Sequence, residues 1–146
     1  MHGCARAPQL SRSVMRLRVA IAVAWFAMVP GFVLGADAPG KYIVGGGVGN
    51  IDCPRFVSTM DRAKKFGAGS VGYVNETQGF LMYVLGFQTA YNLQTPQTCD
   101  IFDTFTSDQL LAWLENYCRA QPLERFGAAV VALAKELHPR RSQSCK

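Results

Sequence analysis

The sequence predicts an all-α protein: a compact bundle of about four short helices with two disulfides, preceded by a signal peptide and a Gly-rich extended arm. Apolar residues recur at helical spacing in four segments between residues 52 and 139. Four cysteines remain once the leader is removed. The length of 146 residues fits one ordinary domain. The expected boundaries are 1–35 for the signal peptide, 36–51 for the arm and 52–146 for the helical domain.

The first 35 residues have the composition of a secretory signal peptide. Residues 19–34 are almost entirely apolar, basic residues precede them, and small residues follow from Gly35. This order is typical of a leader that is cleaved on export. The apolar run is interrupted by Pro30 and is shorter than the roughly 20 residues that a bilayer span needs. We therefore expect no stable membrane span after cleavage. Met15 begins a more typical leader and is an alternative start.

Removal of the leader changes the charge of the protein. The full chain has 15 Lys/Arg and 10 Asp/Glu, which gives a net charge of +5. Cleavage after Gly35 removes four arginines and no acid, so 11 basic and 10 acidic residues remain and the net charge falls to +1. Nucleic acid is therefore not an expected partner. The expected location is periplasmic or secreted.

The cysteines of the exported chain predict two disulfides. An even number of cysteines in an exported chain is typical of a disulfide framework. The four are Cys53, Cys99, Cys118 and Cys145. Their spacing leaves all three connectivities open. No pair is spaced as in a zinc knuckle or a Cys-x-x-Cys redox motif, and His138 is the remaining histidine, so we expect no metal site and no cofactor.

A Gly-rich arm and one helix open the exported chain. The glycines of residues 45–49 fit neither a dinucleotide-binding nor a phosphate-binding motif, so we expect an extended arm there. Residues 42–44 can lay a short strand or arm on the domain. The first predicted helix spans 52–65, with Asp52 or Cys53 as its cap and Pro54 at its first position. The glycines that break the pattern after it are Gly67, Gly69 and Gly72.

Residues 78–92 form the most apolar segment of the exported chain. A helix that is apolar nearly all round is expected to be central and buried. Gly86 costs such a helix about 1 kcal/mol relative to alanine, so we expect it to admit a close helix crossing. Asn92 is a candidate C-cap.

Two further helices complete the predicted bundle. Thr106 and Gln109 form a capping box before a third helix that begins near Leu110. Pro122 is expected in the first turn of a fourth helix, which Pro139 ends. Its residues at helical spacing are Leu123, Phe126, Val130, Leu133 and Leu137.

Few residues of the exported chain suggest catalysis, and we expect no catalytic residue. His138 closes a helix in a Pro/Arg-rich tail and is expected to be structural. Asp100, Asp103 and Asp108 cluster before the third helix, where acids cap free N–H groups, and they are also the candidates for a carboxylate-dependent hydrolase. Asn75 opens an N-x-T glycosylation motif and is expected to cap a helix. Trp113 sits beside an apolar face and is expected to lie in the core or at its rim.

Two segments resemble small exported proteobacterial helical proteins of largely unassigned function. Residues 80–92 fit the pattern F-x-x-Y-x-x-G-F-x-x-A-x-N, and residues 113–123 read W-L-x-N-Y-C-R-A-x-P-L. The layout is similar to that of HdeA-type acid-stress chaperones and Rap/Tai-type immunity proteins. In the latter, one cysteine precedes a helix that begins F-T-x-x-Q-L, here residues 105–110, and another closes the chain. The resemblance covers roughly residues 52–145.

The resemblance implies an all-α exported domain with Cys99 paired to Cys145 and Cys53 paired to Cys118. The one histidine in the tail, the two expected disulfides and the strongly apolar central helix favour a non-enzymatic protein that binds another exported protein, either as a stress chaperone or as an inhibitor or immunity protein. A carboxylate-dependent envelope hydrolase and a purely structural envelope component are the alternatives. The identity of the partner and the oligomeric state are left open.

Overall fold

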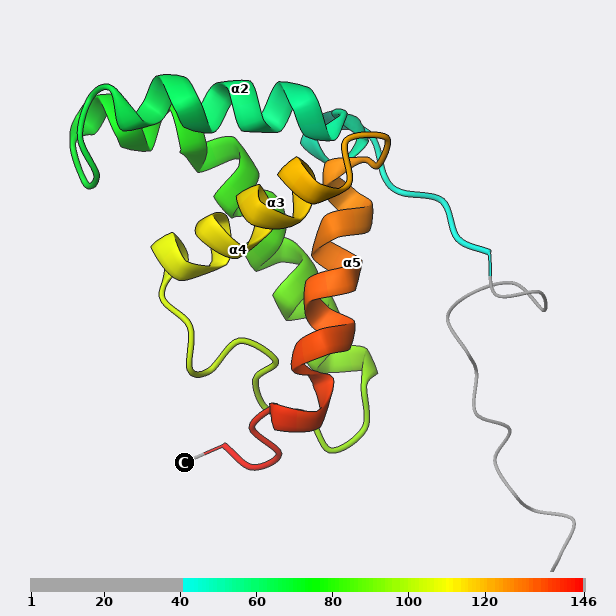
Figure 1. Cartoon of the computed structure of the whole chain (residues 1–146). Helices are drawn as coiled ribbons and strands as arrows, with labels where there is room; N and C mark the ends of the chain where they lie inside the picture. The colour runs from blue at the N-terminus through cyan, green and yellow to red at the C-terminus, as the bar shows by residue number, and fades with distance from the viewer. Residues whose placement is uncertain (1–40, 146) are drawn as a thin grey trace, which may run out of the picture. The chain divides into compact units, whose positions relative to one another are not determined.

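The computed structural model describes residues 41–145, which form an all-α bundle of four helices (Figure 1). The predicted signal peptide and the first residues of the predicted arm lie outside this range. The helices are α2 (Cys53–Lys64), α3 (Val71–Gln94), α4 (Ser107–Ala120) and α5 (Phe126–Leu137). Two 3-10 turns, η2 (Gly47–Asn50) and η3 (His138–Arg140), flank them. Within residues 41–145 there is no β-strand, and the predicted fold class is confirmed.

Helix α2 begins where the sequence predicts. The Asp52 carboxylate accepts a hydrogen bond of 2.8 Å from the backbone N–H of Arg55, which satisfies one of the free donors of the first turn. Cys53 is the first helical residue, so Pro54 is at the second position. The turn after α2 contains Gly67 and Gly69, both with positive φ, which explains why the helix cannot continue there.

Helix α3 begins at Val71, seven residues earlier than the predicted Gln78. Ser70 caps it by accepting a hydrogen bond of 3.1 Å from the N–H of Tyr73. Gly72, one of the glycines expected to break the pattern after the first helix, is the second residue of α3. A Cβ at this position would lie 2.6 Å from the ring of Phe66, so glycine lets the α2–α3 turn pack against the helix.

The C-terminal end of α3 also differs from the prediction. Asn92 lies inside the helix and is not its C-cap, since α3 continues to Gln94 and Thr95 caps it. The side-chain oxygen of Asn92 accepts a hydrogen bond of 3.0 Å from the N–H of Ile101. Asn92 therefore ties the helix to the connection that follows it.

Helices α4 and α5 are joined by a five-residue turn, residues 121–125. The predicted capping box of α4 is confirmed, with Thr106 and Gln109 each bonding the other's backbone. Helix α5 begins at Phe126, so the prediction that Pro122 lies in its first turn was wrong. The end of this turn and the start of α5 pair instead with residues 51–53. The Cys53 N–H donates to the Glu124 carbonyl (3.0 Å), and the Phe126 N–H donates to the Ile51 carbonyl (2.9 Å).

The core of the bundle is built on α5. The buried residues of this helix are Phe126, Gly127, Ala129, Val130, Leu133, Ala134 and Leu137. The ring of Phe126 lies 4.6 Å from that of Phe56 and 4.9 Å from that of Phe80, centroid to centroid. In α3 four residues are buried, among them Phe80 and Val84. The prediction that the 78–92 helix is central and buried was wrong for one side of it. Helix α3 packs on α2, on η2 and on Phe126 of α5, and its other side is exposed.

Glycine allows a close approach at Gly127 and not at Gly86. A Cβ on Gly127 would clash with the Val44 side chain and would lie 2.9 Å from the carbonyl oxygen of Gly49. Val44 thus packs the end of the arm onto α5, although residues 41–45 form no strand. No atom lies within 4 Å of a Cβ built on Gly86. The prediction of a helix crossing at Gly86 within this fold was therefore wrong.

Both disulfides have the pairing that the resemblance implies. Cys53, the first residue of α2, is bonded to Cys118 in the last turn of α4, and both are buried in the core. Cys99 is bonded to Cys145, and this bond lies near the surface. It fastens the C-terminal segment to the α3–α4 connection, beside hydrogen bonds between Asp100 and Ser142. Two intramolecular disulfides are compatible with an oxidising, exported location.

Candidate functional site

The most exposed apolar side chains of the bundle lie beside the N-terminal end of α5. Leu123 in the α4–α5 turn is 100% exposed and Ile43 is 97% exposed. All five residues of the turn, 121–125, are exposed. Because Val44 packs against Gly127, the arm and the turn both flank the start of α5. We call Ile43 together with residues 121–125 the turn surface.

Hydrogen bonds within the turn and to Asn50 hold residues 121–125 in place. The Glu124 N–H donates to the carbonyl of Gln121 (3.1 Å), which closes the turn itself. The Arg125 guanidinium donates to the backbone and side-chain oxygens of Asn50, at 2.8 and 2.6 Å. The Cys53–Cys118 disulfide lies just before the turn. An exposed apolar residue on a turn fixed in this way loses little conformational entropy on binding a partner.

The prediction that Leu123 lies in the fourth helix was wrong. Its spacing of three residues from Phe126 fits a helical face, yet the turn leaves it outside the helix and fully exposed. The turn is set by pairing with residues 51–53, some 70 positions earlier in the chain. No local pattern around Leu123 could have revealed that pairing.

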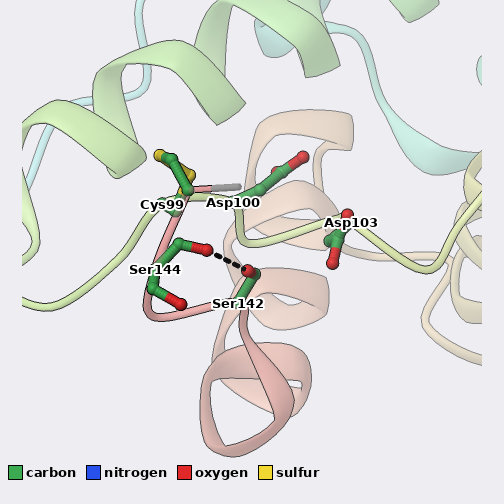
Figure 2. Close-up of a pocket in the computed structure, with 6 residues that line it drawn as sticks. Cys99, Asp100, Asp103, Ser142 and Ser144 are labelled. Atoms are coloured by element: carbon green, nitrogen blue, oxygen red, sulfur yellow. Dashed lines mark hydrogen bonds between the residues drawn. A yellow bond between two sulfur atoms is a disulfide. The ribbon is translucent and has the colours of Figure 1, made fainter.

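A shallow pocket of about 260 Å³ lies at the other end of α5, next to the exposed disulfide (Figure 2). It is lined by Cys99, Asp100, Asp103, Ser142, Ser144 and Cys145. The Asp100 carboxylate oxygen accepts hydrogen bonds from the Gln88 amide (2.6 Å) and from the Phe102 N–H (2.9 Å). These hydrogen bonds fix the α3–α4 connection to α3, so the carboxylate of Asp100 stabilises the fold.

The three candidate acids do not form one site. Asp100 and Asp103 line the pocket, whereas Asp108 lies in the first turn of α4, where an acid complements the helix dipole as predicted. Among residues 41–145 there is no group of three or more His, Cys, Asp and Glu side chains that could hold a metal ion.

Of the remaining candidate residues, His138 and Trp113 contact other side chains of the domain, and Asn75 is exposed. His138 is the C-cap of α5, and its Nδ1 is hydrogen bonded to the Tyr91 hydroxyl at 2.7 Å. Trp113 is half-buried and stacks on Tyr117, which confirms the predicted position at the rim of the core. Asn75 is exposed inside α3, so the prediction that it caps a helix was wrong.

A charged network joins α2 to α4. The Glu115 carboxylate is buried, at 5% side-chain exposure, and accepts from Lys64 (2.7 Å) and Arg119 (2.7 Å). Arg119 also pairs with Asp61. These hydrogen bonds, first to Glu115 and then to Asp61, raise the pKa of the Arg119 guanidinium above its usual range. A buried carboxylate with two cationic partners avoids the cost of an unpaired charge.

Tyr73 is expected to make stability fall at alkaline pH. Burial raises the pKa of this phenol above its ordinary value of 10.0, and the negative charges of Asp108 and Glu115 raise it further. The folded chain therefore retains the proton while the unfolded chain loses it, so the contribution of Tyr73 to stability does not change below about pH 9 and decreases as the pH rises through 10.

We expect Tyr73→Phe to remove this part of the alkaline decrease. Urea unfolding between about pH 7 and 11 measures it, with wild-type protein as the control. Curves for the variant and the wild type that stay parallel across this range would contradict the assignment.

No protein-family model, curated protein or solved structure matches this chain. Within residues 41–145, none of the helices combines the length and hydrophobicity needed to cross a bilayer.

Proposed function

We propose that this protein is an exported, non-enzymatic domain that binds another exported protein through the turn surface. The observation that supports the proposal is a fully exposed leucine on a turn held by backbone hydrogen bonds and adjoining a buried disulfide. A few side chains near the centre of an interface provide most of its binding energy when they enter a well-packed pocket of the partner. A rigid surface of this kind suits one defined partner, as an inhibitor or immunity protein requires.

The chemistry of the turn surface indicates the partner's complementary site. Leu123 requires an apolar pocket, and the neighbouring Glu124 and Arg125 provide one charge of each sign at the rim of that pocket. Arg125 is already bonded to Asn50, so Glu124 is the charge that a partner's cation can meet. Location in the periplasm or outside the cell follows from the predicted leader and is compatible with the two disulfides.

Affinity capture from an envelope extract tests the proposal. The wild-type protein should retain one defined exported protein, and Leu123→Asp should lower that affinity at least about tenfold, because a carboxylate would have to be desolvated in the apolar pocket. Leu93→Asp is the matched control, since Leu93 is 82% exposed but lies on α3. Equal capture by wild type and Leu123→Asp would refute the role of the turn surface. In an immunity function, deletion should also sensitise cells to their kin.

A stress chaperone is the second candidate, and the exposed apolar residues of α3 favour it. Met82 is 60% exposed and Leu93 is 82% exposed, and surfaces of this kind bind unfolded clients. The purified protein should then suppress aggregation of an acid-stressed client at stoichiometric ratios. Absence of suppression at every pH tested would remove this candidate.

A further inference from the structure

The two disulfides of the bundle differ in their exposure to solvent. Cys53 is 0% exposed and Cys118 is 1% exposed, so a reductant does not reach their bond while the domain is folded. Cys99 is half-buried, and its partner Cys145 is exposed. Thiol–disulfide exchange requires a thiolate to approach one of the two sulfurs, so access decides which disulfide reacts. The Cys99–Cys145 bond is therefore the one available for exchange in the folded chain.

The pocket beside this bond gives a reductant room to approach. Both cysteines line the pocket of about 260 Å³, together with two serines and two acids (Figure 2). Ser144 and Cys145 are exposed, so the pocket opens to solvent along the C-terminal segment. Because Cys145 is more exposed than Cys99, its Sγ is the expected point of attack.

Hydrogen bonds hold only the first part of the C-terminal segment in place. The Arg141 guanidinium donates to the Thr98 hydroxyl at 2.9 Å, and Ser142 exchanges backbone hydrogen bonds with Asp100 at 2.9 and 3.2 Å. Within residues 41–145, no hydrogen bond joins residues 143–145 to the α3–α4 connection. Opening the disulfide therefore frees residues 143–145, while Arg141 and Ser142 keep their partners.

The rest of the domain does not depend on this bond. Cys53 and Cys118 belong to the buried core and link α2 to α4 inside it, whereas neither Cys99 nor Cys145 is a core residue. Opening the exposed disulfide leaves the core packing and the buried disulfide intact. The chain can thus exist in two folded forms that differ in their redox state.

We propose that the Cys99–Cys145 bond is a redox-sensitive disulfide, which a dithiol reductant of the Cys-x-x-Cys class opens in the folded protein. One thiolate of the reductant attacks Sγ of Cys145, and the Cys99 sulfur leaves as a thiolate. The second thiolate of the reductant then displaces the Cys145 sulfur. The reductant becomes a disulfide, and its two protons pass to the protein, which gains two thiols.

The opened form differs from the closed form at the pocket. Ser144 and Cys145 supply part of the pocket wall, and both belong to the freed residues 143–145. The turn surface lies at the other end of α5, so this inference does not rest on the proposed function. Either can fail without the other.

Reduction of the folded exported protein with dithiothreitol tests the proposal. Samples are quenched with iodoacetamide, and mass spectrometry of the peptides identifies the labelled cysteines. A form labelled only at Cys99 and Cys145 should accumulate at least about 100-fold faster than label at Cys53 and Cys118, because the buried sulfurs react only after unfolding. The circular dichroism spectrum of this form should match that of the oxidised protein, and urea below the unfolding transition should accelerate only the labelling of Cys53 and Cys118.

Asp103→Asn tests whether the reductant enters through the pocket. Asp103 is an exposed acid of the pocket wall, and its charge opposes the approach of an anionic thiol. The variant should react about twofold faster or more with anionic mercaptoacetate, and no faster with cationic cysteamine. Asp108→Asn is the matched control, since Asp108 lies in the first turn of α4 and not at the pocket, and it should change neither rate.

Three results would overturn the redox-sensitive disulfide. They are labelling of all four cysteines at one rate, labelling of Cys53 and Cys118 first, and loss of the helical spectrum as Cys99 and Cys145 become labelled. Equal effects of Asp103→Asn and Asp108→Asn would overturn the approach through the pocket.

Discussion

Replacing Phe126 with alanine is expected to lower the free energy of unfolding by about 3–5 kcal/mol, the range found when a buried phenylalanine is removed. The ring is fully buried and contacts those of Phe56 and Phe80, with that of Tyr83 further away at 5.9 Å. It is therefore the point at which α2, α3 and α5 meet. A loss of this size is a large part of the 5–15 kcal/mol that stabilises an ordinary domain.

Leu123→Ala is the matched control for this substitution. Leu123 is three residues earlier and fully exposed, so its truncation should change the unfolding free energy by less than about 0.5 kcal/mol. Urea unfolding followed by circular dichroism measures both variants. Similar losses at the two positions would contradict the core described here.

Removing the disulfide between Cys53 and Cys118 is expected to have an effect of similar size. The residues are 65 apart, and closing a loop of that length restricts the unfolded chain by about 4 kcal/mol. Both sulfurs are buried, so alanine at the two positions also leaves unfilled space in the core. The double variant Cys53→Ala/Cys118→Ala should be marginally folded at 37 °C.

The second disulfide provides the comparison. Cys99 and Cys145 are 46 apart, so the chain-entropy contribution is nearly the same, but Cys145 is exposed and its removal leaves no cavity. Cys99→Ala/Cys145→Ala should therefore lose less stability than the buried pair, measured by thermal unfolding under the same conditions. An equal or greater loss would contradict this account.

Much of the fold was predictable because its signals are local. Asp52 caps α2, and Thr106 with Gln109 forms the capping box of α4, through hydrogen bonds that span three residues. Such contacts are determined by neighbouring residues and can be read from the sequence. The cysteine pairing came from a resemblance and not from the spacing, which allows three connectivities.

The predictions from the sequence were wrong where contacts between residues far apart in the chain determine the local structure. Gly72 lies inside α3, and the ring of Phe66 occupies the place where a Cβ at this position would lie. Leu123 is exposed because its turn pairs with residues 51–53. The same pairing forms the turn surface, so the candidate site depended on the tertiary structure and could not be predicted from the sequence. Of the acids that the sequence did single out, Asp100 and Asp103 line one pocket and Asp108 lies apart in the first turn of α4.

Photo-crosslinking in living cells tests the central claim, that the turn surface binds another exported protein, most directly. A photoreactive amino acid would replace Leu123 in one strain and the exposed Gln143 in another. After irradiation, we predict one covalent adduct between position 123 and a second exported protein, and no such adduct at position 143. The absence of an adduct at position 123 in folded protein, or the same set of adducts at both positions, would contradict the claim.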